Sequence, residues 1–248
     1  MKRFVFSLTL AMLISGVSLA EDCHSSDFPS DELHAGEEVL LVDSVFAPQG
    51  FDSNDRIEAV VTGWKPSPCF GEPKSYVERV GNDVRITVKA VRRVTRDRLC
   101  IDMAVPFLLP VRLPQMPAGE YNIYVNHETA VPQFAKMQIA APTNESIDDF
   151  LYPDVEYIKI DPKTRIVEIV GENPSPCYVL DRIISTSNGS NTYALMPIMQ
   201  KKDVICTQQL TPFKYTYRLP NDIQASKVLV HVRTIDGKSK NKVFSMTN

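Results

Sequence analysis

Residues 63–69 read G-W-K-P-S-P-C, and residues 171–177, 108 positions later, read G-E-N-P-S-P-C. The likeness continues downstream, because each copy has a second cysteine followed by Pro-Phe and Arg-Leu-Pro at the same internal spacings. Both copies fit the pattern G-x2-P-S-P-C-x(28 or 30)-C-x5-P-F-x4-R-L-P, which holds eleven identical residues in one order. Chance does not readily produce such agreement, so the sequence predicts two copies of one folding unit.

Each copy contains two cysteines, and the repeat indicates how they pair. The pairs Cys69–Cys100 and Cys177–Cys206 stay within each copy, whereas crossed pairs would require the two units to interpenetrate. Each bridge closes a loop that, if unfolded-state entropy dominates, stabilises the fold by about 3–4 kcal/mol. A zinc site in each copy is the alternative, but neither copy has a C-x2-C pair or a neighbouring histidine pair.

The N-terminus predicts export. Lys2 and Arg3 precede an apolar stretch over residues 4–17, and small residues lead up to Ala20, which fits a signal peptide over residues 1–20. A membrane anchor is the alternative, but the stretch is short for a span and polar residues follow it at once. We therefore expect a periplasmic or secreted protein with no transmembrane segment after cleavage.

Cys23 is the fifth cysteine and lies outside the repeat, in a polar N-terminal arm over residues 21–37. We interpret it as a free thiol, with an intermolecular disulfide and a Cys23-linked dimer as the alternative. A lipid-modified cysteine is a third interpretation, which Glu21 and Asp22 disfavour because small or apolar residues usually precede such a site.

The charge balance argues against one class of partner. Removing Lys2 and Arg3 with the leader leaves 25 basic and 30 acidic residues, a net charge of −5. A dedicated nucleic-acid binder needs a basic surface to displace phosphate counterions. We therefore expect no nucleic-acid partner.

Short segments with strand chemistry predict an all-β fold. Residues 84–90 alternate apolar and polar side chains, and Asn188-Gly189 predicts a tight hairpin turn. About seven such segments per copy, antiparallel and within about 100 residues, predict an immunoglobulin-like β-sandwich. The predicted sandwiches occupy residues 38–141 and 153–248, joined by a polar linker over residues 142–152, which is either a hinge or an ordered connector.

The pair resembles the tandem immunoglobulin-like modules of bacterial exported proteins. Residues 117–126, P-A-G-E-Y-N-I-Y-V-N, are similar to the late hairpins of those modules. The resemblance covers residues 38–248 and implies two tandem β-sandwich domains, each of which then contains one intradomain disulfide. The cysteines flank loops, so the bridge differs from that of antibody domains, and the resemblance implies no functional site.

The strongest signal for a binding site is basic. Arg92, Arg93 and Arg96 precede Cys100, and the disulfide should hold them beside the segment that carries Trp64 and Lys65. Arginines next to an exposed aromatic ring can bind an anionic or sugar-containing ligand. We predict these five residues as ligand-binding. The structural interpretations that compete with this one are a charged surface loop and a Trp64 that covers the core.

Signals for catalysis are weak. None of the four histidines recurs in both copies, and the chain has no G-x-S-x-G, H-E-x-x-H or glycine-rich phosphate loop. We predict no catalytic residue, no metal site and no cofactor. The recurrent Phe107 and Phe213 should be core anchors, and Arg112 and Arg218 should close strand ends through carbonyl or carboxylate contacts.

These observations favour a non-catalytic exported envelope protein that binds or supports a protein or glycan partner. A periplasmic assembly chaperone with two immunoglobulin-like domains is one alternative, and an edge strand open to donor-strand pairing would favour it. A secreted protease inhibitor that presents a disulfide-pinned loop is another. A hydrolase would need a buried triad.

Overall fold

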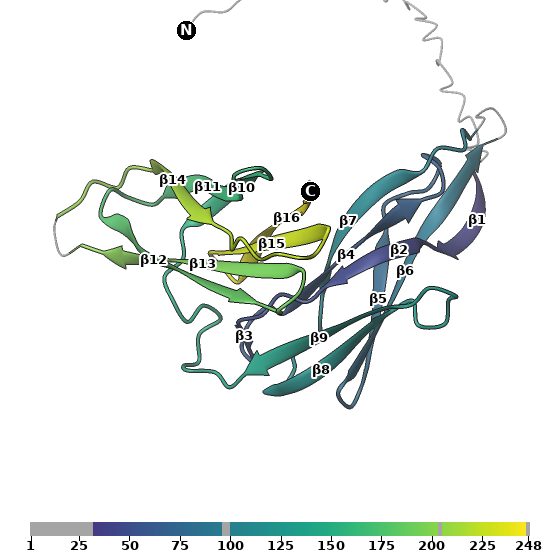
Figure 1. Ribbon diagram of the computed structural model, residues 1–248, viewed down its shortest axis with the longest axis horizontal. Coiled ribbons are helices and arrows are strands. Elements are labelled where there is room, and N and C mark those ends of the chain that lie inside the picture. The colour runs from purple at the N-terminus through teal and green to yellow at the C-terminus, as the bar shows by residue number, and fades with distance from the viewer. Residues whose placement is uncertain (1–31, 96–99, 203–204, 247–248) are drawn as a thin grey trace, which may run out of the picture. The chain divides into compact units, whose positions relative to one another are not determined.

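The computed structural model describes residues 32–95, 100–202 and 205–246. The regular elements in these residues are β-strands, and they build two β-sandwiches (Figure 1). No helix in the described part of the chain is long and apolar enough to cross a membrane. The predicted signal peptide, Cys23 and Arg96 lie outside the described residues.

The first sandwich packs a three-stranded sheet against a six-stranded one. The smaller sheet has the order β2-β4-β7, and the larger has the order β1-β6-β8-β9-β3 with β5 also paired to β6. The strands are β1 (Glu32–Val39), β2 (Leu41–Phe46), β3 (Phe51–Asp52), β4 (Glu58–Lys65), β5 (Lys74–Val80), β6 (Asp83–Thr95), β7 (Val105–Arg112), β8 (Gly119–Val125) and β9 (Gln133–Ala140).

The second sandwich repeats this plan with fewer strands. Its sheets have the orders β10-β11-β14 and β12-β13-β15-β16. The strands are β10 (Asp154–Asp161), β11 (Ile166–Asn173), β12 (Tyr178–Ser187), β13 (Thr192–Lys201), β14 (Thr211–Arg218), β15 (Lys227–Thr234) and β16 (Lys238–Ser245). Each sandwich has its own buried apolar cluster, which confirms two all-β units.

The structure corrects the expectation of purely antiparallel strands, because β3 pairs with β9 in parallel and one further parallel pair recurs in each sandwich. β6 pairs with β8 in parallel, and β13 pairs with β15 in parallel. In each case the intervening strand, β7 or β14, belongs to the opposite sheet. The chain crosses to the other layer and returns, so the strand that comes back runs in the direction of the one that left.

The recurrent glycine and phenylalanine serve one packing feature. Gly63 lies opposite Phe107 across β4 and β7, and Gly171 lies opposite Phe213 across β11 and β14. A Cβ on Gly63 would collide with the carbonyl oxygen of Leu41 and lie 2.8 Å from the Phe107 ring. The same clash at Gly171 involves the carbonyl oxygen of Asp154 and the Phe213 ring at 2.9 Å. The glycine thus lets a neighbouring backbone and an aromatic ring approach closely.

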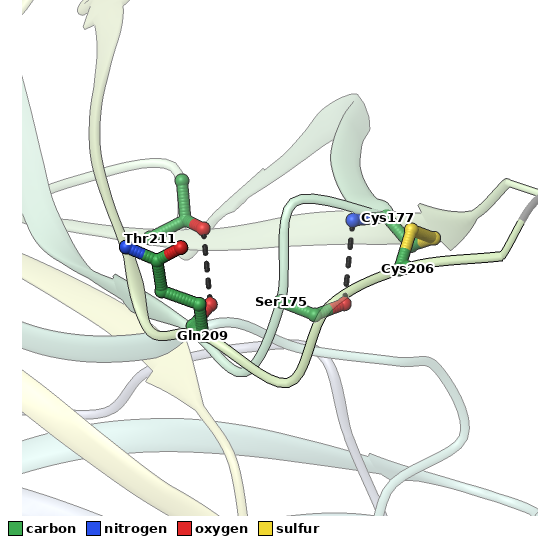
Figure 2. The surroundings of a disulfide bond; sticks show 5 residues. All are labelled: Ser175, Cys177, Cys206, Gln209 and Thr211. Carbon is green, nitrogen blue, oxygen red and sulfur yellow. Dashed lines mark hydrogen bonds between the residues drawn. A yellow bond between two sulfur atoms is a disulfide. The ribbon is translucent and has the colours of Figure 1, made fainter.

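The P-S-P-C segment forms the same turn in both copies. The Cys69 amide donates to the Ser67 hydroxyl and the Cys177 amide to the Ser175 hydroxyl, each at 3.3 Å, and Figure 2 shows the turn of the second copy. The disulfides Cys69–Cys100 and Cys177–Cys206 are both formed, each with a Cα–Cα distance of 5.9 Å. The predicted pairing within each copy is therefore confirmed.

The Arg-Leu-Pro motif works through its leucine rather than its arginine. Leu113 and Leu219 are buried, and their amides donate to the carbonyls of Ile57 and Arg165 at 2.9 Å. Within the described residues, neither motif arginine has a carbonyl or carboxylate partner, so the expected strand-end contacts of Arg112 and Arg218 are wrong. The predicted packing of Phe107 and Phe213 against their cores is confirmed.

The predicted arm and linker are more ordered than the sequence suggested. Glu32–Val39 forms β1 and pairs with β6. The prediction of a polar arm over residues 21–37 is therefore wrong for residues 32–37, which belong to the first sandwich. In the linker, Tyr152 is buried, and the Leu151 carbonyl accepts a hydrogen bond from the Met199 amide at 2.8 Å. Asp148 accepts one from the Gly237 amide at 3.0 Å. The linker is thus an ordered connector rather than a hinge.

The two sandwiches meet face to face through β4 and β15. Val60 of β4 and Leu229 of β15 belong to one apolar cluster at this contact. Alternate residues of a strand share a face, so the neighbours of Val60 and Leu229 two positions away face the same contact. An apolar cluster of Phe46, Val60 and Leu229, with Val243 packed against it, lies between the sandwiches. On β15, Leu229 of this cluster is followed on the same face by His231 and Arg233, and a polar group surrounds each of these two residues.

The first polar group is an ion pair. The Arg233 guanidinium donates to both carboxylate oxygens of Asp55, with one of the two contacts at 3.0 Å. The two side chains are only 5% and 6% exposed. Burial opposes the charge on Arg233, but Asp55 outweighs it, so the pKa of Arg233 is raised.

The second polar group surrounds Glu58. One of its carboxylate oxygens accepts from Ser239 at 2.6 Å and from Asn241 at 2.7 Å. The Nδ1 atom of the fully buried His231 lies 3.4 Å from the same oxygen. Burial alone would raise the pKa of Glu58, but His231, Ser239 and Asn241 together lower it.

Substituting Gly63 by alanine should destabilise the first sandwich by about 3 kcal/mol, because a backbone carbonyl cannot move aside cheaply. Denaturant unfolding of the variant measures the loss. Gly36→Ala is the matched control, since a Cβ there meets nothing within 4 Å. Equal stability of the two variants would contradict the close-approach argument.

Asp55→Ala should destabilise the protein by about 3–5 kcal/mol, because it leaves the buried Arg233 charge unpaired. Calorimetric unfolding measures the effect. Glu120→Ala, which removes the exposed partner of Lys136, should leave the stability close to that of the wild type. The double variant Asp55→Ala/Arg233→Met should recover part of the loss, and a strictly additive result would refute the pairing.

The lowered pKa of Glu58 makes the junction sensitive to acid. A carboxyl group with a lowered folded-state pKa stabilises the fold above its unfolded pKa, and that stability is lost as the pH falls through its folded pKa. The Tm should therefore fall more steeply below about pH 4.5 in the wild type than in Glu58→Gln. Differential scanning calorimetry between pH 7 and pH 3 tests this, and parallel pH profiles would argue against it.

Candidate functional site

The structure separates the four predicted ligand-binding residues that it describes, Trp64, Lys65, Arg92 and Arg93, instead of collecting them. Trp64 lies on β4 in the smaller sheet, whereas Arg92 and Arg93 lie on β6 in the larger one. Consecutive strand residues point to opposite faces, so Lys65 leaves β4 on the other side from Trp64. The Lys65 side chain is 12% exposed, and its ammonium lies 4.0 Å from Glu72.

The basic segment does lie beside the P-S-P-C turn, where backbone contacts of β6 hold it. The Arg93 amide donates to the Cys69 carbonyl at 2.9 Å, and Phe70 forms a β-bridge with Arg92. Both arginines are exposed there. Because Trp64 faces the second sandwich from the other sheet, the proposed pairing of Trp64 with these arginines is wrong.

Trp64 lies instead in a cleft between the sandwiches. The cleft has a volume of about 330 Å³ and takes Pro106, Leu108 and Trp64 from the first sandwich. Lys227 and Val243 come from the second. Trp64 is 39% exposed. The competing interpretation, in which Trp64 covers the core, is therefore not supported.

Asp43 organises the polar side of this cleft. It is the extra residue of a β-bulge, because the register of β2 against β4 shifts between Val42 and Ser44. A bulge redirects a side chain out of the regular alternation. Asp43 accepts from the Thr62 hydroxyl at 2.6 Å, from the Trp64 indole at 3.0 Å and from the Lys227 ammonium at 2.9 Å.

These contacts set the charge state of the cleft. Burial opposes ionisation of Asp43, but the hydrogen bonds from Thr62, Lys227 and Trp64 and the charge of Lys227 outweigh it. The pKa of Asp43 is consequently lowered, and the group is a carboxylate at neutral pH. The cleft therefore offers a fixed aromatic ring, a carboxylate and a partly exposed ammonium, which suits a ligand with an apolar face and polar edges.

Sequence reasoning identified Trp64 but missed Asp43 and Lys227. These two residues are 184 positions apart in the chain, and only the contact between sandwiches brings them together. The repeat offered one indirect signal. The bulge recurs at Glu156 in β10, since the register there shifts between Val155 and Tyr157. Asp43 is thus an acidic residue at a recurrent bulge.

Comparison with known protein families agrees with the duplicated architecture. A model of the ORF11 beta-sandwich domain matches residues 59–134 and, a second time, residues 167–246. The two matches begin 108 positions apart, which is the offset of the P-S-P-C repeat. No curated protein and no solved structure matches the chain. Because the two matches span more than half of its length, the chain belongs to the ORF11 beta-sandwich domain family, of which it contains two copies.

Proposed function

We propose that this protein is a non-catalytic binding protein of the cell envelope, periplasmic or secreted, that holds a protein or glycan partner in the Trp64 cleft. The observation that carries the proposal is the state of Trp64. Its indole N–H is fixed by Asp43, yet more than a third of the residue is uncovered. A rigid, exposed aromatic ring loses little entropy when a sugar ring or a side chain packs on it.

The surroundings of the cleft support a rigid binding role. The Asp55–Arg233 pair and the Glu58 group connect the two sandwiches beside it, and a disulfide closes a loop in each unit. A preorganised site binds more tightly because it has less to order on binding. Disulfides also suit an oxidising, exported compartment.

His127 and His231 have structural surroundings, which favours binding over hydrolysis. His231 is fully buried at the junction, with Nδ1 2.9 Å from Asn241. The His127 ring lies 3.7 Å from Glu128 beside the turn that follows β8. Neither environment places a hydroxyl or thiol nucleophile against the imidazole, which nucleophilic catalysis would need.

Two features also favour this role over those of a protease inhibitor and an assembly chaperone. Ser67 and Ser175 are buried between exposed prolines, so the P-S-P-C turn does not present its serine side chains to a protease. The edge strand β7 contains Pro106 and Pro110, which lack the N–H groups that donor-strand pairing by a chaperone uses.

Trp64 is the only tryptophan of the chain, so its fluorescence reports on the cleft directly. Partners captured from envelope extract on the immobilised full chain should change Trp64 emission saturably when added back. Trp64→Ala should reduce capture about tenfold or more. Tyr157→Ala is the matched control, because Tyr157 is a similarly exposed aromatic residue at 43%.

A second variant separates this cleft from the basic segment. Reversing the charge of Arg92, Arg93 and Arg96 should leave capture intact if the partner occupies the Trp64 cleft. Loss of capture in the arginine variant with full capture by Trp64→Ala would overturn the proposal. So would a captured partner that leaves Trp64 emission unchanged.

A further inference from the structure

A second cavity lies at the junction of the two sandwiches, separate from the Trp64 cleft, and two arginines line it. Its volume is about 240 Å³. Arg56 and Arg112 come from the first sandwich, and Ser239 and Asn241 come from β16 of the second. Neither arginine side chain has an ion-pair partner in the described part of the chain. Guanidinium groups that line a cavity without a counter-ion suit the binding of an oxyanion.

Arg112 is next to a carboxylate with which it does not pair. It lies directly opposite Glu58 in the antiparallel pair of β4 and β7, so both side chains leave the same face of the sheet. The Glu58 carboxylate instead accepts hydrogen bonds from Ser239 and Asn241, at 2.6 Å and 2.7 Å. The second sandwich thus engages Glu58, and the exposed guanidinium of Arg112 keeps its donors for another acceptor.

Arg56 rests on the second sandwich. A Cβ on Gly237 would lie 3.1 Å from both the Cγ and the Cδ atoms of Arg56, so the aliphatic stem of the arginine passes close to the turn between β15 and β16. The Gly237 amide in this turn donates to Asp148 at 3.0 Å. An arginine whose stem is already packed loses less entropy when its head group binds.

The second copy keeps the motif arginine but not its charged neighbours. Arg218 is the counterpart of Arg112, and Ile166 lies opposite it across the sheet. The position of Arg56 is occupied by Thr164 in the second copy. The Arg-Leu-Pro motif therefore does not require a second arginine beside it, and the pair belongs to the copy whose sheet meets the other sandwich.

We propose that this cavity binds a phosphate group, to which Arg56 and Arg112 each donate from a guanidinium fork. A single carboxylate has two oxygens, which one fork can occupy, whereas a phosphate group has enough oxygens for two forks. Its charge of about −2 also matches two cations. Lys238 lines the cavity as well, but its ammonium contacts Asp236 at 3.2 Å. Glu58 does not compete for the arginines, because β16 engages its carboxylate.

The same group can come from inorganic phosphate or from a phosphate monoester. Inorganic phosphate and methyl phosphate serve as the two probes. Preferential binding of one over the other tells the sources apart, and either result supports a phosphate site. Acetate, with one negative charge and two oxygens, should bind about tenfold more weakly than phosphate. Equal affinity for acetate and phosphate would refute the proposal.

Isothermal titration calorimetry on the full chain, at constant ionic strength, measures these affinities. Arg56→Gln and Arg112→Gln should each weaken phosphate binding about tenfold. Arg218→Gln is the matched control, because Arg218 is the exposed motif arginine of the second copy and does not line the cavity. The control should bind as the wild type does, and equal losses in Arg112→Gln and Arg218→Gln would overturn the site.

Thermal unfolding provides a second readout and shows that each variant is folded. Phosphate should raise the Tm of the wild type and of Arg218→Gln more than that of the double variant Arg56→Gln/Arg112→Gln. General effects of phosphate on burial act on all three proteins alike, so an equal rise in all three would contradict the proposal.

The cavity and the Trp64 cleft lie at opposite ends of β7, because Pro106 pairs with Trp64 and Arg112 pairs with Glu58. Trp64→Ala should therefore bind phosphate as the wild type does, and the two proposals stand or fall separately.

Discussion

The buried ionic pair between Arg233 and Asp55 is the constraint on which the arrangement of the two sandwiches depends. A charge taken out of water must find its partner in good geometry, or the fold loses several kcal/mol. With the Glu58 group, this pair leaves few arrangements in which both sets of partners meet. The apolar cluster beside them, which includes Val60 and Leu229, supplies hydrophobic contact but little direction. Polar contacts thus select the geometry, while apolar contacts favour association.

Comparing the two copies shows why only one of the two equivalent sheet faces is covered. Val60 of the first copy corresponds to Glu168 of the second, and Leu108 corresponds to Lys214. In the second copy these positions form an ion pair, Lys214–Glu168, with the lysine side chain 57% exposed. The same scaffold position is therefore apolar where a sandwich packs on it and charged where water meets it. Burial of an unpaired charge is costly, which explains why the two faces are not interchangeable.

The residues that recur and the residues that differ have separate roles. In both copies, the recurrent glycine and phenylalanine form the close contact between backbone and ring. The recurrent cysteine forms the disulfide turn, and the recurrent leucine closes the strand end. The cross-strand pair beside the bulge differs: Leu41 faces Trp64 in one copy, and Asp154 faces Glu172 in the other. In the first copy this scaffold position contributes Trp64 to the cleft. Duplication thus preserved the residues that hold the sheets together and left an adjacent position free to acquire different chemistry.

The sequence by itself determined the duplication, the all-β class and the disulfide pairing, because these depend on local period, spacing and turn chemistry. Asn188-Gly189 does mark the turn between β12 and β13, and Gly189 has a positive φ of 74°, but the loop holds four residues, 188–191, rather than the two of the predicted tight turn. The parallel strand pairs, the ordered linker and the cleft were decided only by the tertiary structure. Arg233 and Asp55 are 178 positions apart, and each reads as an ordinary solvated residue in its own strand or turn. No local pattern encodes a contact between two outer faces, since burial of a polar strand face depends on what the rest of the chain places against it.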